Sequence, residues 1–194
     1  MDNKDKLLIE FEPEVLADIF AAAHLCEVEI SGLAKVERHG RKFRVYDSAL
    51  IFNQSCSLAR TEPDIEALNL YFNNIAAAGD ADKIKEMESQ TLWWHSHVWF
   101  EVVFSGTDLR TMKKLLSGFD PWWLALVVNK RNESCLALIE RNGGFMKYEE
   151  APIKLCPKVT EKEFNQLIES RRDTIQHLIN QRVLILKLKD ENKK

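Results

Sequence analysis

The sequence has few cysteines and no cysteine pair. Cys26, Cys56, Cys135 and Cys156 are far apart in the 194 residues, and no CxxC motif occurs. This spacing argues against a disulfide framework and against a zinc site built from thiolates. The four side chains are instead expected to be small buried hydrophobes.

An excess of basic charge is also absent, since 27 lysines and arginines face 30 acids and the net charge is -3. Nucleic acid is therefore not expected as a partner. No apolar run approaches the roughly 20 residues that cross a bilayer, so no membrane contact is expected either. The segment Met1 to Lys6 is polar and unlike a signal peptide, which predicts a cytoplasmic location.

Internal repeats, low-complexity stretches and linkers rich in proline, glycine or serine are missing as well. A chain of 194 residues fits one domain with a helical tail, and its 45% hydrophobic residues are ordinary for a globular protein. We therefore expect a domain over residues 1–155, followed by an amphipathic helix and a short tail over residues 156–194.

Hydrophobic periodicity predicts alternating helices and strands. Helical spacing is found over 14–25, 62–75, 81–89 and 107–116, and a final helix opens with the capping box Thr160 to Glu163. Strands are predicted over 28–36, 42–52, 55–59, 91–95, 122–129, 134–140 and 145–149, with a turn at 38–41. This order predicts an α/β (α+β) domain with one mixed sheet flanked by helices.

Two histidines at the end of a predicted buried strand carry the clearest chemical signal. His95 and His97 are two residues apart, so strand alternation places both imidazoles on one face, where they can share a divalent metal. Asp108, from the next element, would add an oxygen ligand. Two histidines and a carboxylate leave a fourth tetrahedral position for water, as in catalytic zinc sites. Zinc would lower the pKa of that water to about 7.

Ser105 has two possible roles in the same segment. It stands three residues before Asp108, which is the spacing of a helix N-cap. Its hydroxyl could also stabilise the oxyanion that forms at a substrate carbonyl. The sequence leaves open whether Ser105 does one or both.

The complete pattern, HSH-x7-S-x2-D, resembles that of the JAMM-type (MPN+) zinc metallopeptidases. That family also carries an upstream glutamate in an E-x-x-G context, and Glu29 to Gly32 has this form just after the first helix. The resemblance implies one zinc per chain and Glu29 as general base, with Glu27 as the competing candidate. It also implies a cytidine-deaminase-like MPN fold over residues 13–155, with a curved mixed sheet and a helix on each side.

The loop after the second histidine departs from the family pattern. Val98 stands where many members have proline, and residues 98–104 are unusually apolar. We expect Trp99 and Phe100 in this loop to contact substrate. The context is more similar to prokaryotic and phage members than to eukaryotic deubiquitinases, and the short segment between Asp108 and Trp122 leaves no room for a long ubiquitin-binding insertion. The resemblance implies a peptidase or isopeptidase acting on a protein or peptide, such as a ubiquitin-like tail or its lysine conjugate.

Other interpretations of the same residues remain. The histidine pair could be packed without metal, and the chain could be an MPN-fold scaffold or binding module with little turnover. A zinc deaminase would need a PCxxC element, which neither Cys135 nor Cys156 provides. The C-terminal helix could cover the sheet, or its apolar stripe could form a dimer or partner contact.

Overall fold

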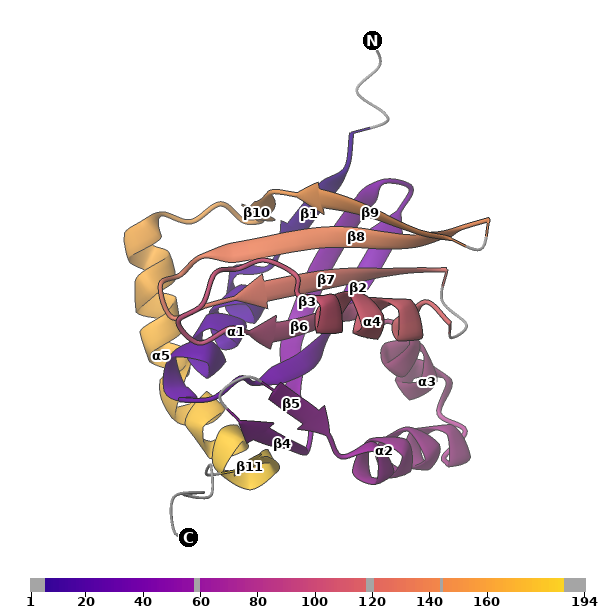
Figure 1. The fold of residues 1–194 in the computed structure, drawn as a ribbon, viewed down its shortest axis with the longest axis horizontal. Helices are drawn as coiled ribbons and strands as arrows, with labels where there is room; N and C mark the ends of the chain where they lie inside the picture. Colours follow the sequence, from indigo (N-terminus) through magenta and orange to yellow (C-terminus); the bar gives the residue numbers. More distant parts are fainter. Residues whose placement is uncertain (1–5, 58–59, 118–120, 144, 187–194) are drawn as a thin grey trace, which may run out of the picture.

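The structure, a computed structural model, describes residues 6–57, 60–117, 121–143 and 145–186. These residues form a mixed α/β fold in which helices pack on a large curved sheet and a smaller sheet lies at one end (Figure 1). The elements are β1 (Leu8–Phe11), α1 (Pro13–Leu25), β2 (Ser31–His39), β3 (Lys42–Ile51), β4 (Gln54–Ser57), β5 (Arg60–Pro63), α2 (Ile65–Ala77), α3 (Ala81–Glu88), β6 (Leu92–Ser96), α4 (Gly106–Leu115), β7 (Trp122–Val128), β8 (Ser134–Asn142), β9 (Phe145–Ala151), β10 (Ile153–Leu155), α5 (Glu161–Arg182) and β11 (Val183–Ile185).

The large sheet is mixed and strongly curved. Its strand order is β10-β1-β3-β2-β6-β7-β8-β9. β1 runs parallel to β3 and β10, β6 runs parallel to β7, and the remaining neighbours are antiparallel. β9 and β10 stand at opposite ends of this strand order, yet only Pro152 separates them along the chain. The sheet therefore curls until it is nearly closed. A mixed sheet flanked by helices, as the sequence predicts, is confirmed.

Both faces of the central strands are covered, which explains their continuous apolar sequence. Leu92 and Trp94 of β6 belong to the core cluster that includes α1, whereas Trp93 belongs to a second cluster with Met112 of α4. Strand alternation therefore sends neighbouring side chains into two separate cores. The end of β6 lies between these cores, in the middle of the sheet.

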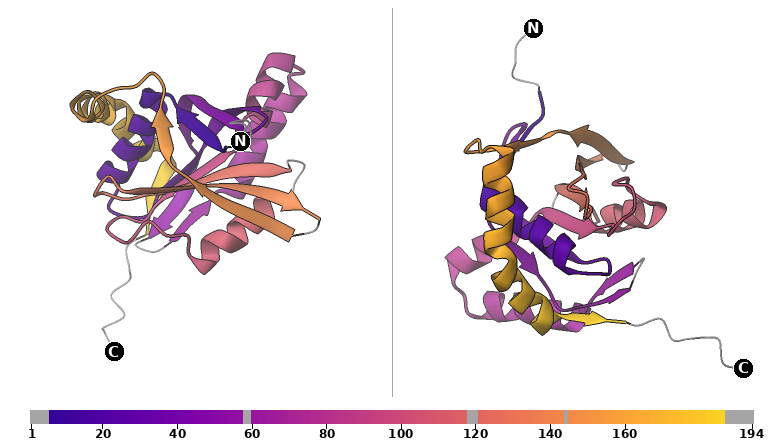
Figure 2. Two further views of the ribbon diagram at one scale, coloured as in Figure 1. Left: turned by 90° about the horizontal axis from the view of Figure 1, so that it is seen from above. Right: turned by 90° about the vertical axis from the view of Figure 1, so that its left-hand side faces the viewer.

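α5 packs along α1 on one side of the sheet (Figure 2). Ten of the 13 residues of α1 are buried, and Ile168, Ile175 and Ile179 of α5 join the same core cluster. Residues on both sides of position 155 thus share one hydrophobic core. The division at 155 and a contact through α5 remain predictions, and residues 187–194 of the expected tail lie outside the described residues.

The observed strands correct several sequence expectations. β2 begins at Ser31 rather than at Val28 and runs to His39, so the turn contains only Gly40 and Arg41. β5 occupies positions expected to open a helix, and α2 begins after Asp64, whose carboxylate caps it. The strand expected over 55–59 is observed as β4, with residues 58–59 outside the described part. β1, β10 and β11 were not predicted.

The small sheet has the order β11-β4-β5, which leaves β5 at one edge. β11 runs parallel to β4, and β5 pairs antiparallel with β4. Within the described ranges, no helix combines the length and the hydropathy that crossing a bilayer requires.

Candidate metal centre

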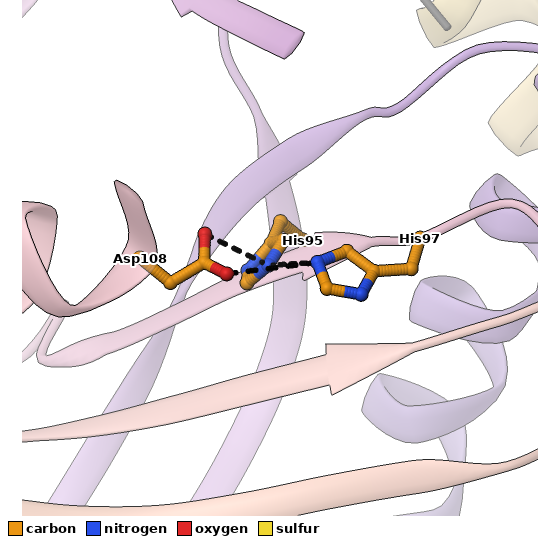
Figure 3. A group of neighbouring side chains, drawn as sticks. All are labelled: His95, His97 and Asp108. Carbon is orange, nitrogen blue, oxygen red and sulfur yellow. Dashed lines mark hydrogen bonds and ion pairs between the residues drawn. The ribbon is translucent and has the colours of Figure 1, made fainter. Parts of the chain in front are cut away.

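His95 and His97 lie at the end of β6, between β2 and β7. Ser31 of β2 is the register partner of His95. The backbone N–H of His97 donates to the Val128 carbonyl at 2.9 Å, so pairing with β7 continues one residue beyond β6. The two Nε2 atoms are 3.1 Å apart (Figure 3). The prediction that both imidazoles share one face is therefore confirmed.

Asp108 reaches the histidines from the first turn of α4. The Ser105 hydroxyl accepts a hydrogen bond from the Asp108 N–H at 3.2 Å, and Asp108 Oδ2 accepts one from the Ser105 N–H at 2.6 Å. This capping box holds Asp108 Oδ1 3.3 Å from His95 Nε2 and Oδ2 3.6 Å from His97 Nε2. All three side chains are buried, with their ligand atoms within 4.8 Å of one another. The structure thus brings the three predicted ligands together.

The spacing of these donor atoms fits a small divalent cation. Tetrahedral coordination with metal–nitrogen bonds of about 2.1 Å places ligand atoms about 3.4 Å apart. The separations of 3.1, 3.3 and 3.6 Å are close to that value. His97 Nδ1 donates to the Glu101 carbonyl at 2.8 Å, which leaves the lone pair of Nε2 free for a metal. The donor set leaves a further coordination position, as a catalytic site requires.

Burial and mutual charge set the protonation of this group. Burial lowers the pKa of His95, so this imidazole is neutral, the form that binds a metal. Burial opposes protonation of His97 too, but Asp108 and the Glu101 carbonyl outweigh it and raise the pKa of His97. Burial alone would raise the pKa of Asp108, yet the two histidines hold it well below its usual range. An ionised Asp108 is available as a ligand.

Glu29 lines the same cleft, but it does not lie on a strand as expected. It stands in the connection between α1 and β2, two residues before Ser31, and its N–H donates to the Ser57 carbonyl at 3.1 Å. Burial raises the pKa of Glu29 to about 7. The competing Glu27 is 78% exposed and pairs with Lys130 Nζ at 2.7 Å. Of these two glutamates, Glu29 lines the cleft and Glu27 does not.

The cleft has a volume of about 1160 Å³, and exposed apolar side chains such as Ile65 and Val103 line it together with charged ones such as Glu62 and Arg131. Ser105 lines it, so this residue caps α4 and also faces the cavity. Trp99 and Phe100 line it with exposed fractions of 59% and 64%. Their expected contact with substrate stays a prediction.

Two contributions to the cleft had no signal in the sequence. The Glu101 carbonyl orients His97, and a backbone carbonyl cannot be recognised from residue identity. The second wall comes from β5 and the start of α2, where Thr61, Glu62 and Ile65 face the cleft. This wall depends on the pairing of β4 with β5, which the sequence did not predict.

No family model matches the chain, and no curated protein matches its sequence. The function proposed below therefore depends on the side chains of the cleft and their arrangement.

Proposed function

We propose that this chain is a JAMM-type (MPN+) zinc metallopeptidase or isopeptidase that hydrolyses an amide bond. The carrying observation is the convergence of His95, His97 and Asp108 in a cleft that Glu29 also lines. The chain order HSH-x7-S-x2-D, with an upstream E-x-x-G, supports the assignment. Imidazole and carboxylate donors at tetrahedral spacing suit zinc, with one ion per chain.

The arrangement of elements supports the same proposal. A curved mixed sheet with α1 on one side and α4 on the other agrees with the cytidine-deaminase-like MPN fold. In this fold the metal ligands would come from a central strand and the helix that follows it. β6 and α4 supply them here.

Each side chain of the cleft has a distinct part in the proposed hydrolysis. A bound zinc ion supplies a water of pKa near 7 and a Lewis acid for the substrate carbonyl. Glu29, with a pKa of about 7, takes the proton of the attacking water and returns it to the leaving amine. The cap uses the Ser105 hydroxyl only as an acceptor, so its proton can be donated to the carbonyl oxygen as negative charge develops.

The proposed substrate is an extended protein end, such as the tail of a ubiquitin-like protein or its conjugate to lysine. β5 is an edge strand, and its residues Thr61 and Glu62 face the cleft. An extended tail can pair with such an edge and present its amide to the metal. Trp99 and Phe100 would contact the tail or the leaving group across the cleft.

The first test combines metal content with cleavage in three proteins: wild type, Glu29→Gln and Glu27→Gln. All three should bind one zinc, because neither glutamate is a ligand. Glu29→Gln should reduce cleavage of ubiquitin-like fusions and lysine conjugates by about 10²- to 10⁴-fold. Glu27→Gln is the matched control from the same segment and should cleave like wild type. A chelator should abolish cleavage by the wild type and by Glu27→Gln.

Two results would count against this function. Failure of the wild type to bind zinc after reconstitution would contradict the metal site. Zinc binding without chelator-sensitive cleavage would contradict the peptidase assignment and favour the scaffold role.

A further inference from the structure

The loop that follows His97 is held by three consecutive residues at the end of β7. The Val128 carbonyl accepts from the His97 N–H at 2.9 Å, and the Lys130 N–H donates to the Val98 carbonyl at 2.8 Å. Between them, Asn129 Nδ2 donates to the Phe100 carbonyl at 3.0 Å. Residues 128–130 thus fix the backbone of the metal-ligand loop at three points.

Asn129 is the only side chain among these three contacts, and it is fully buried at 0% exposure. Its Oδ1 accepts from the N–H groups of Arg131 and Glu133 at 3.0 and 3.1 Å. Its Nδ2 also donates to Glu133 Oε2 at 2.6 Å. The oxygen of the amide therefore closes its own turn, while the nitrogen both binds Glu133 in that turn and reaches across to the loop.

The loop needs such support because its backbone is strained. Val98 has φ = 45°, in the left-handed region, which a β-branched residue rarely adopts. Such a conformation persists only where the surroundings impose it. Proline, found at this place in many of the proteins that the motif resembles, has φ fixed near -65° and could not adopt it.

The Glu101 carbonyl connects this support of the loop to the candidate metal ligands. The Glu101 carbonyl, one residue after the Phe100 carbonyl that Asn129 holds, accepts the Nδ1 proton of His97. His95 lacks equivalent support, since its buried Nδ1 has no hydrogen-bond partner in the described part of the structure. Of the two Nδ1 atoms, that of His97 is therefore the one that a hydrogen bond orients in the described part of the structure.

We propose that Asn129 is a positioning residue for the metal centre, which holds the loop so that the Glu101 carbonyl fixes the tautomer and orientation of His97. The proposal rests on the metal site proposed above. Partners that orient a metal-binding histidine commonly change metal affinity by about 10- to 100-fold.

The test replaces only the donor half of the amide. Asn129→Asp keeps the oxygen that accepts from Arg131 and Glu133 but loses the donor to Phe100, and adding Glu133→Gln avoids two facing carboxylates. Glu133→Gln alone is the matched control. Zinc affinity, measured by chelator competition, should be about 10- to 100-fold weaker in the double variant than in the control. Imidazole ¹⁵N spectra of the metal-free proteins should show His97 with a proton on Nδ1 in the control and a mixture of tautomers in the double variant.

Equal affinity and an unchanged His97 tautomer would overturn the proposal. If the double variant does not fold, Asn129→Ser repeats the test, because serine keeps a hydroxyl in the turn but is too short to reach Phe100. If the wild type binds no metal, the proposed function fails, whereas the tautomer of His97 still decides the role of Asn129.

Discussion

At the scale of single residues, burial of Glu29, the proposed general base, reduces the stability of the fold that holds it. Burial raises its pKa from 4.5 to about 7. In the metal-free protein, folded Glu29 keeps its proton up to about pH 7, whereas the unfolded chain loses it near pH 4.5. The folded state therefore binds more protons in this interval, and stability falls as the pH rises through it.

Glu29→Gln removes this titration. The metal-free variant should be about 1–3 kcal/mol more stable than wild type at pH 8, and the two should be nearly equal at pH 4.5. Urea unfolding at both pH values measures the difference. A stability gap that is the same at both pH values would contradict the raised pKa of Glu29.

Gly32, the glycine of the E-x-x-G segment, is required by close packing rather than by backbone conformation. A Cβ here would lie 2.5 Å from the Trp94 indole and closer still to the Leu50 carbonyl. Gly32→Ala must push β2 away from its neighbours, at a cost of about 1–3 kcal/mol. Since Glu29 precedes this strand by two residues, the same shift should displace it.

Gly106→Ala is the control for this substitution. The added Cβ would lie 3.8 Å from the Arg110 guanidinium, within a helix, so it should be neutral or stabilising by about 0.5–1 kcal/mol. Chemical unfolding of both variants compares the two costs. Equal effects would show that the contact with Trp94 is not tight.

At the scale of elements, the segments that place the metal ligands were predictable because local residues specify them. The capping box of Ser105 and Asp108 starts α4, and the apolar run from Leu92 to Trp94 marks a strand covered on both faces. Asp108 is thus both a helix signal and a candidate metal ligand. A single pattern therefore predicted the start of the helix and the grouping of the candidate ligands together.

The strands that sequence reasoning missed depend on distant partners. β1 contains Glu10, which interrupts an apolar run, yet its carboxylate pairs with Lys42 Nζ and Lys154 Nζ at 2.9 Å each. Lys154 is 144 residues away, so no local pattern could reveal the pairing. In β5, residues 62–63 were expected to open a helix; proline is tolerated in this strand because β5 lies at a sheet edge.

The packing of α5 on α1 includes one buried charge. Asp18 of α1 is 2% exposed, and Arg171 reaches it with two hydrogen bonds of 2.5 and 3.1 Å. Arg171→Met leaves that carboxylate buried without its partner and should cost about 3 kcal/mol.

Arg172→Met is the matched control for Arg171→Met. Arg172 pairs with the exposed Glu169 at 3.6 Å, so its loss should change stability by less than about 0.5 kcal/mol. Thermal or urea unfolding separates the two expectations. If both substitutions lower the stability by similarly small amounts, the Asp18 carboxylate becomes hydrated when Arg171 is replaced.

At the scale of the whole molecule, the grouping of the three candidate ligands could be predicted, but the cavity around them could not. His95, His97 and Asp108 are close in sequence, and their side chains carry the signal. The opposite wall, with Thr61 from β5, and the Glu101 carbonyl arise only from tertiary packing.

Whether the metal centre needs α5 is a question about the whole fold. Ile168, Ile175 and Ile179 are buried in the core cluster shared with α1 and the sheet, and Phe164 packs edge-on against Phe20 at 6.1 Å. A chain ending at residue 155 keeps Glu29 and the three candidate metal ligands but exposes this surface of α1. It should lose a cooperative thermal transition and one-to-one zinc binding, whereas a chain ending at residue 186 should keep both.

Circular dichroism melting and zinc content of the two truncated chains decide between two descriptions of this protein. If residues 1–155 unfold, the ligands are insufficient by themselves, because the ion pair of Asp18 and the apolar face of α1 both require α5. The metal centre would then be a property of the complete fold. If residues 1–155 melt cooperatively and bind zinc, the sheet and α1 suffice, and α5 becomes the element available to contact a second copy or a partner.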